Sequence, residues 1–105
     1  MKKTVLVTGG SRGLGASIAR VFAQYNYNVI INYKESDILA NNLKKELESN
    51  YNIEVLLVKA DISCEEEVRK MFQSIIDHYP KIDVLVNNAS ISIDIDLVSK
   101  DALEF

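Results

Sequence analysis

The stretch TVLVTGGSRGLG, residues 4–15, decides the fold class of this 105-residue chain. Thr4–Thr8 is a β-branched apolar run that predicts a strand. Four glycines follow within seven positions, and no glycine occurs after Gly15. Glycine lets the backbone turn sharply and lets a phosphate approach without a Cβ in the way, and a helix N-terminus offers unpaired N–H groups. The stretch therefore predicts a phosphate-binding turn between a strand and a helix; the alternative is a glycine turn that serves packing alone.

Short apolar runs alternate with amphipathic stretches along the rest of the chain. Runs at 29–31, 54–59 and 83–86 predict three further strands, and 99–105 reads as the first turns of another helix. Helical periodicity predicts three helices between the strands, with apolar positions at Leu14, Ile18, Val21, Phe22 and Tyr25, at Leu39, Leu43 and Leu47, and at Val68, Met71, Phe72, Ile75 and Ile76. Ser36 is the expected N-cap of the second helix. Ser63 and Glu66 predict a capping box for the third.

This βαβαβαβ order predicts one α/β domain over residues 1–105, with a parallel sheet and right-handed crossovers. We expect the first half of a Rossmann-type doubly wound fold with strand order 3-2-1-4. The fourth strand would then lie at an edge, although it is apolar on both faces and has no charge or proline in its middle. We therefore expect either further chain beside it or a second chain, including a second copy, that covers that edge.

Composition excludes several classes of protein. The net charge of −3 provides no positive surface for nucleic acid or for anionic membranes. The longest apolar stretches have about four residues, far short of the roughly 20 of a membrane helix. Cys64 is the only cysteine, so no internal disulfide forms and a reducing cytoplasm is expected. The lone histidine, His78, has no neighbours at metal-ligand spacing, so no metal site is predicted.

Three motifs at strand ends carry a resemblance to a known family. The glycine pattern Thr8-Gly9-x-x-x-Gly13-x-Gly15, the segment Asp61-Ile62-Ser63 and the segment Asn87-Asn88-Ala89 occur in the order of the short-chain dehydrogenase/reductase family. The resemblance covers essentially the whole chain. Within the family, these stretches are most similar to the β-ketoacyl-(acyl-carrier-protein) reductase branch. One departure is Ser90, which stands where the family usually has glycine.

The resemblance implies a nicotinamide dinucleotide as cofactor. Asp61 would accept a hydrogen bond from the adenine amino group, with Ile62 near the ring; a structural alternative is that Asp61 helps cap the following helix. Asn88 and Ala89 would lie beside the riboses, whereas Asn87 is expected to bridge backbone groups at the strand ends. The candidate cofactor-binding residues are Gly9, Ser11, Arg12, Gly13, Leu14, Gly15, Tyr33, Lys34, Asp61, Ile62, Asn88, Ala89 and Ser90.

The residues after the second strand favour NADP(H) over NAD(H). An acidic residue there holds a ribose 2′-hydroxyl, whereas a basic residue accommodates a 2′-phosphate. By the resemblance, Tyr33 stands where the NAD-type acid would align, and Lys34 follows it. Arg12, in the glycine loop, resembles the family's basic residue beside the adenosine ribose. Against this, Glu35 is close to the spacing expected of a ribose acid, and is interpreted as a solvated loop charge. The structural alternative is that Arg12 and Lys34 are ordinary surface cations.

Carbonyl reduction also needs a proton donor. In the resembling family this is a tyrosine four residues ahead of a lysine, with an upstream serine, and none of the five tyrosines here has that spacing. The first hypothesis is therefore the cofactor-binding N-terminal portion of an NADPH-dependent reductase of 3-oxoacyl thioesters or similar ketones, whose catalytic residues lie in further sequence. The second is a stand-alone truncated module that binds dinucleotide without catalysis. A weaker third is a purely structural interaction domain that binds no dinucleotide.

Overall fold

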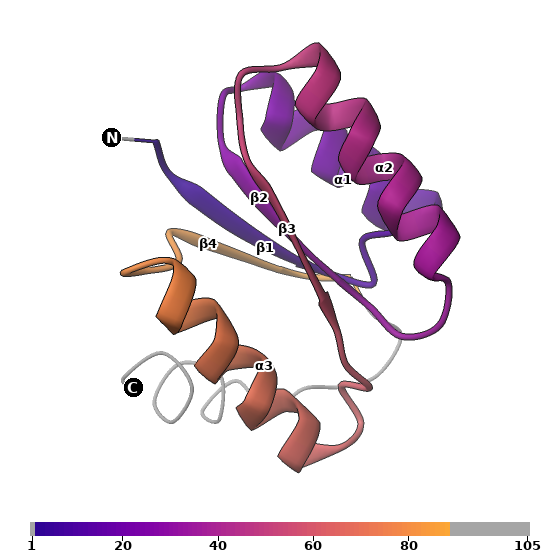
Figure 1. Cartoon of the computed structure of the whole chain (residues 1–105), viewed down its shortest axis with the longest axis vertical. Helices are drawn as coiled ribbons and strands as arrows, with labels where there is room; N and C mark the ends of the chain where they lie inside the picture. The colour runs from indigo at the N-terminus through magenta and orange to yellow at the C-terminus, as the bar shows by residue number, and fades with distance from the viewer. Residues whose placement is uncertain (1, 89–105) are drawn as a thin grey trace.

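The computed structural model describes residues 2–88, which form a four-stranded parallel sheet with helices on both faces (Figure 1). Its strand order, β3-β2-β1-β4, confirms the expected order. The elements in chain order are β1 (Thr4–Thr8), α1 (Gly13–Gln24), β2 (Asn28–Tyr33), α2 (Asp37–Asn50), β3 (Val55–Lys59), α3 (Glu65–His78) and β4 (Val84–Asn87). The helical turns expected at 99–105, with Ala89 and Ser90, lie outside the described residues.

Two hydrophobic clusters hold the layers together, one on each face of the sheet. Alternate strand residues face opposite sides, so Val5 and Val7 belong to the cluster under α1 and α2, whereas Leu6 belongs to the cluster under α3. In Figure 1 the first two helices cover one face and α3 covers the other. The strands are apolar on both faces because both are covered, as is usual in parallel sheets.

Helix α1 buries a face made mainly of small residues. Its buried residues are Gly15, Ala16, Ala19 and Ala23. The large apolar side chains of Leu14, Val21 and Tyr25 are 69%, 51% and 74% exposed. Small residues on the buried face let the helix approach the sheet closely. This close approach favours alanine and glycine there over the larger apolar side chains, which remain on the exposed face. The helical spacing predicted for this segment is confirmed, but three of the apolar residues that define it lie outside the core.

The helix starts follow the sequence in one case and depart from it in another. The Ser36 hydroxyl accepts a hydrogen bond from the Leu39 amide at 3.2 Å, which confirms the predicted cap of α2. Leu39 itself is 39% exposed, and Ala40 takes its place in the core. The predicted capping box of α3 was wrong, because Cys64 is the N-cap residue and makes no side-chain cap.

The C-terminus of α1 is closed by a Schellman arrangement. Asn26 has φ 68° and donates its N–H to the carbonyl of Ala23, and Tyr27 donates to Phe22. The rings of Phe22 and Tyr27 pack edge to face at 4.9 Å between centroids. These two backbone bonds and the accompanying apolar contact are the features of that motif, with asparagine in the left-handed position where glycine is commonest.

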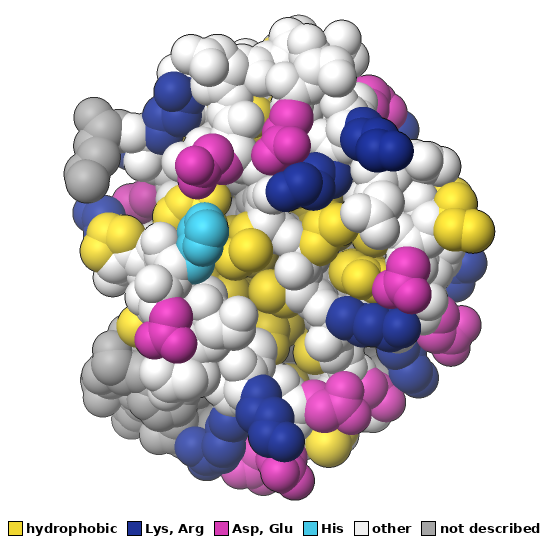
Figure 2. Space-filling model, viewed as in Figure 1, with side chains coloured by type: hydrophobic (Ala, Val, Ile, Leu, Met, Phe, Trp, Pro, Cys, Tyr) yellow, Lys and Arg dark blue, Asp and Glu magenta, His cyan; other side chains and the backbone are white. Residues whose placement is uncertain are grey.

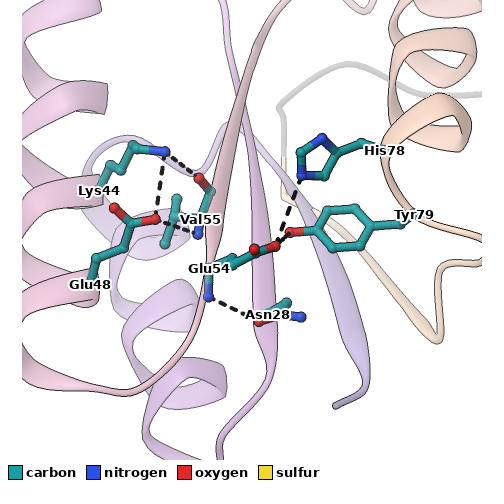
Figure 3. A network of polar contacts seen from close by, with 7 residues as sticks. All are labelled: Asn28, Lys44, Glu48, Glu54, Val55, His78 and Tyr79. Carbon is teal, nitrogen blue, oxygen red and sulfur yellow. Dashed lines mark hydrogen bonds and ion pairs between the residues drawn. The ribbon is translucent and has the colours of Figure 1, made fainter. Parts of the chain in front are cut away.

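Polar side chains at the amino end of the sheet bind one another and the backbone (Figure 3). The Tyr79 hydroxyl donates to the Glu54 carboxylate at 3.1 Å, and the Glu54 amide donates to the side chain of Asn28 at 2.9 Å. Lys44 and Glu48 of α2 bind the carbonyl and the amide of Val55 at 2.6 and 2.9 Å. The network joins α2, α3 and the first residues of β2 and β3.

Strand β3 lies at an edge of the sheet between α2 and α3. Figure 2 shows apolar side chains gathered along this edge, with charged side chains around them. Leu57, Val58 and Met71 are among the residues that line a shallow hollow of about 290 Å³ there. The hollow lies away from the glycine turn, which is at the carboxyl ends of the strands.

Candidate functional site

A cavity of about 410 Å³ opens at the carboxyl ends of β1, β2 and β3. In an open α/β sheet, ligands bind where the crossovers switch direction at this end, here between β1 and β4. The residues around the cavity come from the glycine turn and from the segments after each strand. They are Gly9, Ser11, Arg12, Asn32, Tyr33, Lys34, Glu35, Ser36, Ala60, Asp61, Ile62 and Asn88.

The glycine turn needs glycine for two separate reasons. Gly9 and Gly13 have φ of 61° and 57°, a left-handed conformation that disfavours other residues. Gly15 is needed for space, because an added Cβ would lie 2.1 Å from the Gly9 carbonyl oxygen and 2.6 Å from the side-chain nitrogen of Asn88. The last glycine therefore lets the first turn of α1 pack against the loop itself.

Asn32 organises the site and was not singled out from the sequence. Its side chain is buried, accepts from the Gly9 amide at 3.3 Å, and donates to the carbonyls of Val58 and Ala60 at 3.3 and 3.2 Å. The Gly10 amide donates to the Asn32 backbone carbonyl at 3.0 Å. The side-chain amide of Asn32 thus connects the glycine turn with the ends of β2 and β3. The available signal was a polar residue within a buried apolar strand, which must find partners.

Two asparagines, Asn87 at the end of β4 and Asn88 directly after it, complete the wall beside the glycine turn. The side-chain nitrogen of Asn88 donates to the Gly9 carbonyl at 3.1 Å. The backbone N–H of Asn88 donates to the Thr8 hydroxyl at 3.0 Å. Asn87 accepts from the Thr8 hydroxyl at 3.2 Å. Asn87 was expected to bridge backbone groups, but its side chain binds the Thr8 hydroxyl instead. Asn88 binds the backbone of the glycine turn and also lines the cavity.

Asp61 occupies the wall formed by the end of β3. One carboxylate oxygen, Oδ1, accepts from the amide and the hydroxyl of Ser63 at 2.9 and 2.6 Å. The other, Oδ2, lies 3.6 Å from the ammonium of Lys34. The Ser63 hydrogen bonds and, more weakly, Lys34 hold the pKa of Asp61 below its ordinary value. Glu67 accepts from the Asp61 amide at 2.9 Å.

The end of β2 forms another wall of the cavity. Tyr33 is buried, and its hydroxyl donates to Asp37 at 2.8 Å, so the ring is anchored to the first turn of α2. Burial first and then this carboxylate raise the pKa of Tyr33. The Asp37 carboxylate also lies 3.4 Å from the Lys59 ammonium. Glu35 is exposed, as expected of a solvated charge, and nevertheless lines the cavity.

Arg12 differs from Lys34 in having no ion pair within residues 2–88. It is exposed, lines the cavity and is the N-cap residue of α1, where its side chain makes no capping bond. Within residues 2–88, the first turn of α1 therefore has no side-chain cap. An uncapped helix N-terminus beside a free guanidinium has the chemistry of an anion site.

The structure brings eight of the predicted site residues together around the cavity, and they are Gly9, Ser11, Arg12, Tyr33, Lys34, Asp61, Ile62 and Asn88. Gly13, Leu14 and Gly15 form the start of α1 without lining the cavity, and Leu14 points to solvent. Ala89 and Ser90 lie outside the described residues. Across residues 2–88 no group of three acidic, histidine or cysteine side chains is placed to hold a metal ion, and no helix is long and apolar enough to cross a membrane.

A family model described as short chain dehydrogenase matches residues 3–104. The chain belongs to the short chain dehydrogenase family. It is 38% identical over 94 residues to the 3-oxoacyl-(acyl-carrier-protein) reductase FabG of Staphylococcus epidermidis, and 37% identical over the same length to that of Staphylococcus aureus. Each alignment covers 90% of this chain and 38% of the relative. The chain thus spans less than half the length of these curated relatives.

Two solved structures show the same arrangement of elements. L-sorbose reductase from Gluconobacter frateurii, complexed with NADPH and L-sorbose, superposes with a TM-score of 0.80 at 28% identity, over 86% of this chain and 34% of the other. A 3-oxoacyl-(acyl-carrier-protein) reductase from Brucella melitensis gives 0.78 at 32% identity, over 88% and 36%. The four-stranded unit corresponds to about a third of those chains.

Proposed function

We propose that this chain binds NADP(H) and forms the cofactor-binding part of a short-chain dehydrogenase that reduces a carbonyl group. The observation that carries the proposal is the cavity at the carboxyl ends of the strands, bordered by an uncapped helix N-terminus and by two cations, Arg12 and Lys34. Family membership supports a nicotinamide dinucleotide as the ligand. When bound, the dinucleotide would supply the hydride.

The residues present fit such a ligand. The turn from Gly9 to Gly13 and the first amides of α1 would hold the pyrophosphate, because glycine leaves that surface free of side chains. Nothing lies within 4 Å of a Cβ built on Gly13, so the loop is open on that side. Asp61 and Ile62 would contact the adenine end, and Asn88 would lie toward the riboses.

A 2′-phosphate explains the charges better than a free 2′-hydroxyl does. Tyr33 stands where an acid would bind a hydroxyl, and its own hydroxyl is already used by Asp37. Arg12 and Lys34 supply two positive charges for a phosphate that carries about −1.5 to −2. Glu35 at the same rim opposes a phosphate, but it is a single exposed charge. The L-sorbose reductase that superposes on this chain is complexed with NADPH, which supports the same choice.

We propose a 3-oxoacyl thioester or a similar ketone as the substrate of the whole protein, since the curated relatives are 3-oxoacyl-(acyl-carrier-protein) reductases. The 105 residues hold no tyrosine four positions ahead of a lysine. The chain as given is therefore expected to bind cofactor without reducing ketones. The alternative function is a stand-alone dinucleotide-binding module, favoured by a cavity that residues 2–88 complete on three sides by themselves.

Calorimetric titration of the chain with NADPH and with NADH tests the proposal. Arg12→Glu is expected to weaken NADPH binding by at least about tenfold, because a charge-assisted contact becomes a repulsion, with a much smaller effect on NADH. Lys45→Glu is the matched control, since Lys45 is exposed and does not line the cavity. Equal losses for both cofactors would refute the NADP assignment, and absence of heat with either would refute dinucleotide binding.

The reading frame downstream of the given sequence, together with steady-state assays of the extended protein, separates the two functions. Neither function allows the chain as given to turn over a 3-oxoacyl thioester with NADPH. Extension of the reading frame with a downstream Ser and Tyr-x-x-x-Lys would restore turnover under the first function, and an immediate natural stop codon would support the second. Turnover by the 105-residue chain, free of any longer contaminant, would contradict the expectation that catalytic residues lie elsewhere.

A further inference from the structure

The ion pair between Lys34 and Asp61 crosses the cavity from the end of β2 to the end of β3. Its atoms lie 3.6 Å apart, and both residues line the cavity. The Lys34 side chain is 59% exposed and that of Asp61 is 28% exposed. A second pair at the same end of the sheet, Lys59 with Asp37, has a similar separation of 3.4 Å. Neither of its members lines the cavity, so the first pair alone can be affected directly by a ligand there.

We propose that Asp61 is a specificity-determining residue that acts by competing with a ligand phosphate for the ammonium of Lys34. This inference rests on the proposed function and deepens it. With no phosphate beside the ribose, Lys34 binds Asp61 and occupies its Oδ2. With a 2′-phosphate present, Lys34 transfers to the phosphate and leaves Oδ2 free to accept a hydrogen bond from the ligand.

The geometry allows this exchange without moving Asp61. Its Oδ1 remains held by the amide and hydroxyl of Ser63, so only the partner of Oδ2 changes. An exposed lysine–carboxylate pair is weak, because water screens the charges and a long side chain must be ordered. A phosphate carries about twice the charge of a carboxylate and therefore wins the ammonium.

The consequence is that Lys34 has opposite effects on two kinds of ligand. It attracts a ligand with a 2′-phosphate. It obstructs a ligand without one, because it stays across the cavity and masks the only carboxylate oxygen of Asp61 that is not bonded to Ser63. A simple phosphate-binding lysine would give the first effect and not the second, so the sign of the second effect distinguishes the proposal.

The test compares adenosine 2′,5′-bisphosphate with adenosine 5′-monophosphate, which differ only in the 2′-phosphate. Lys34→Met keeps the length of the side chain and removes its charge. Lys59→Met is the matched control, since it removes a lysine from an equivalent pair that does not line the cavity. Comparison of the two variants cancels the general loss of positive potential that any removed lysine causes.

Relative to Lys59→Met, we expect Lys34→Met to bind the bisphosphate about tenfold more weakly and the monophosphate about two- to fivefold more tightly. Weaker or unchanged binding of the monophosphate would overturn the inference while leaving the proposed function intact. If the unmodified chain binds neither probe, the proposed function fails and the inference with it. Lys34→Gln gives a second variant at this exposed position, with circular dichroism as the check that each variant folds.

Discussion

The two ends of the sheet differ in how fully their polar side chains are paired. At the amino end, Glu54, Tyr79 and Asn28 bind one another, and the backbone of Val55 is bound by α2 side chains (Figure 3). At the carboxyl end, Asn32 holds the glycine turn in place, yet the two cations that line the cavity, Arg12 and Lys34, are paired weakly or not at all. Arg12 has no ion pair within the described part of the chain, and the first turn of α1 has no side-chain cap.

The difference indicates which end is structural and which binds a ligand. Polar groups that are satisfied internally contribute to stability, whereas unpaired donors and exposed charges cost little to redirect toward a ligand. Substitutions at the amino end should therefore change stability alone. Substitutions at the carboxyl end should change ligand binding, with or without a change in stability.

The largest effect is expected for Gly15→Ala. The new Cβ would lie 2.1 Å from the Gly9 oxygen and 2.9 Å from the Gly10 Cα, so backbone must move. We expect a loss of about 2–4 kcal/mol in the free energy of unfolding, together with loss of detectable NADPH binding. Urea denaturation and calorimetry measure the two quantities.

Gly13→Ala is the control for that substitution. Nothing lies within 4 Å of its Cβ, so its cost of about 1–2 kcal/mol comes from the positive φ alone. If the two variants were equally stable, the close packing of α1 against the glycine turn would not determine the geometry of the site.

Tyr79→Phe tests the amino end. Removing the hydroxyl leaves the Glu54 carboxylate with one partner fewer, at an expected cost of about 1 kcal/mol in unfolding free energy and no change in NADPH affinity. Burial first and then Glu54 raise the pKa of Tyr79. A raised pKa means stability that is present below the ordinary tyrosine value of about 10 and lost as the pH rises above it.

The variant should therefore lose less stability than the unmodified chain between about pH 10 and 11. Denaturation curves at neutral and alkaline pH measure this difference. Because Tyr33 also has a raised pKa, some alkaline sensitivity remains in the variant. A clear loss of NADPH affinity in Tyr79→Phe would show that the two ends are coupled. It would contradict the division into a structural end and a ligand-binding end.

The sequence predicted the elements and the glycine turn because these depend on local signals, whereas the strand order follows from the order usual in doubly wound sheets. The glycines mark one strand-to-helix turn, Ser36 has the chemistry of an N-cap, and the apolar strands alternate with amphipathic helices. These signals are short-range, so they can be recognised without knowing what packs against them.

What the sequence did not predict depends on contacts between distant segments. Leu14, Val21 and Tyr25 have the spacing of a core face, but close approach of α1 to the sheet favours the alanines. Asn32 stands out locally only as a polar residue in a buried apolar strand, and its role depends on carbonyls 26 and 28 positions away. The pairing of Lys34 with Asp61 arises because parallel strands bring their carboxyl ends together, which the order 3-2-1-4 implies but periodicity does not reveal.

The smallest effect is expected at the edge of β3. The Val29 N–H donates to the Glu54 carbonyl, so this backbone carbonyl of Glu54 faces β2. The backbone N–H and carbonyl of the next residue, Val55, therefore face outward from the sheet. Lys44 and Glu48, which also lie 3.5 Å from each other, bind that outward carbonyl and amide. They occupy the positions that a neighbouring strand would use, and unpaired edges invite association.

Lys44→Met should lower the free energy of unfolding by only about 0.5–1 kcal/mol, because water replaces the lost contact. Its larger consequence should be self-association, measured by sedimentation over a range of protein concentrations. Lys45→Met removes the same charge from an exposed neighbour that makes no ion pair or hydrogen bond to a strand within residues 2–88. If Lys44→Met stays as monomeric as Lys45→Met, the α2 side chains do not protect the edge. Greater association by Lys44→Met alone, with unchanged NADPH affinity, would show that this protection belongs to the structural end of the sheet and is independent of the ligand-binding end.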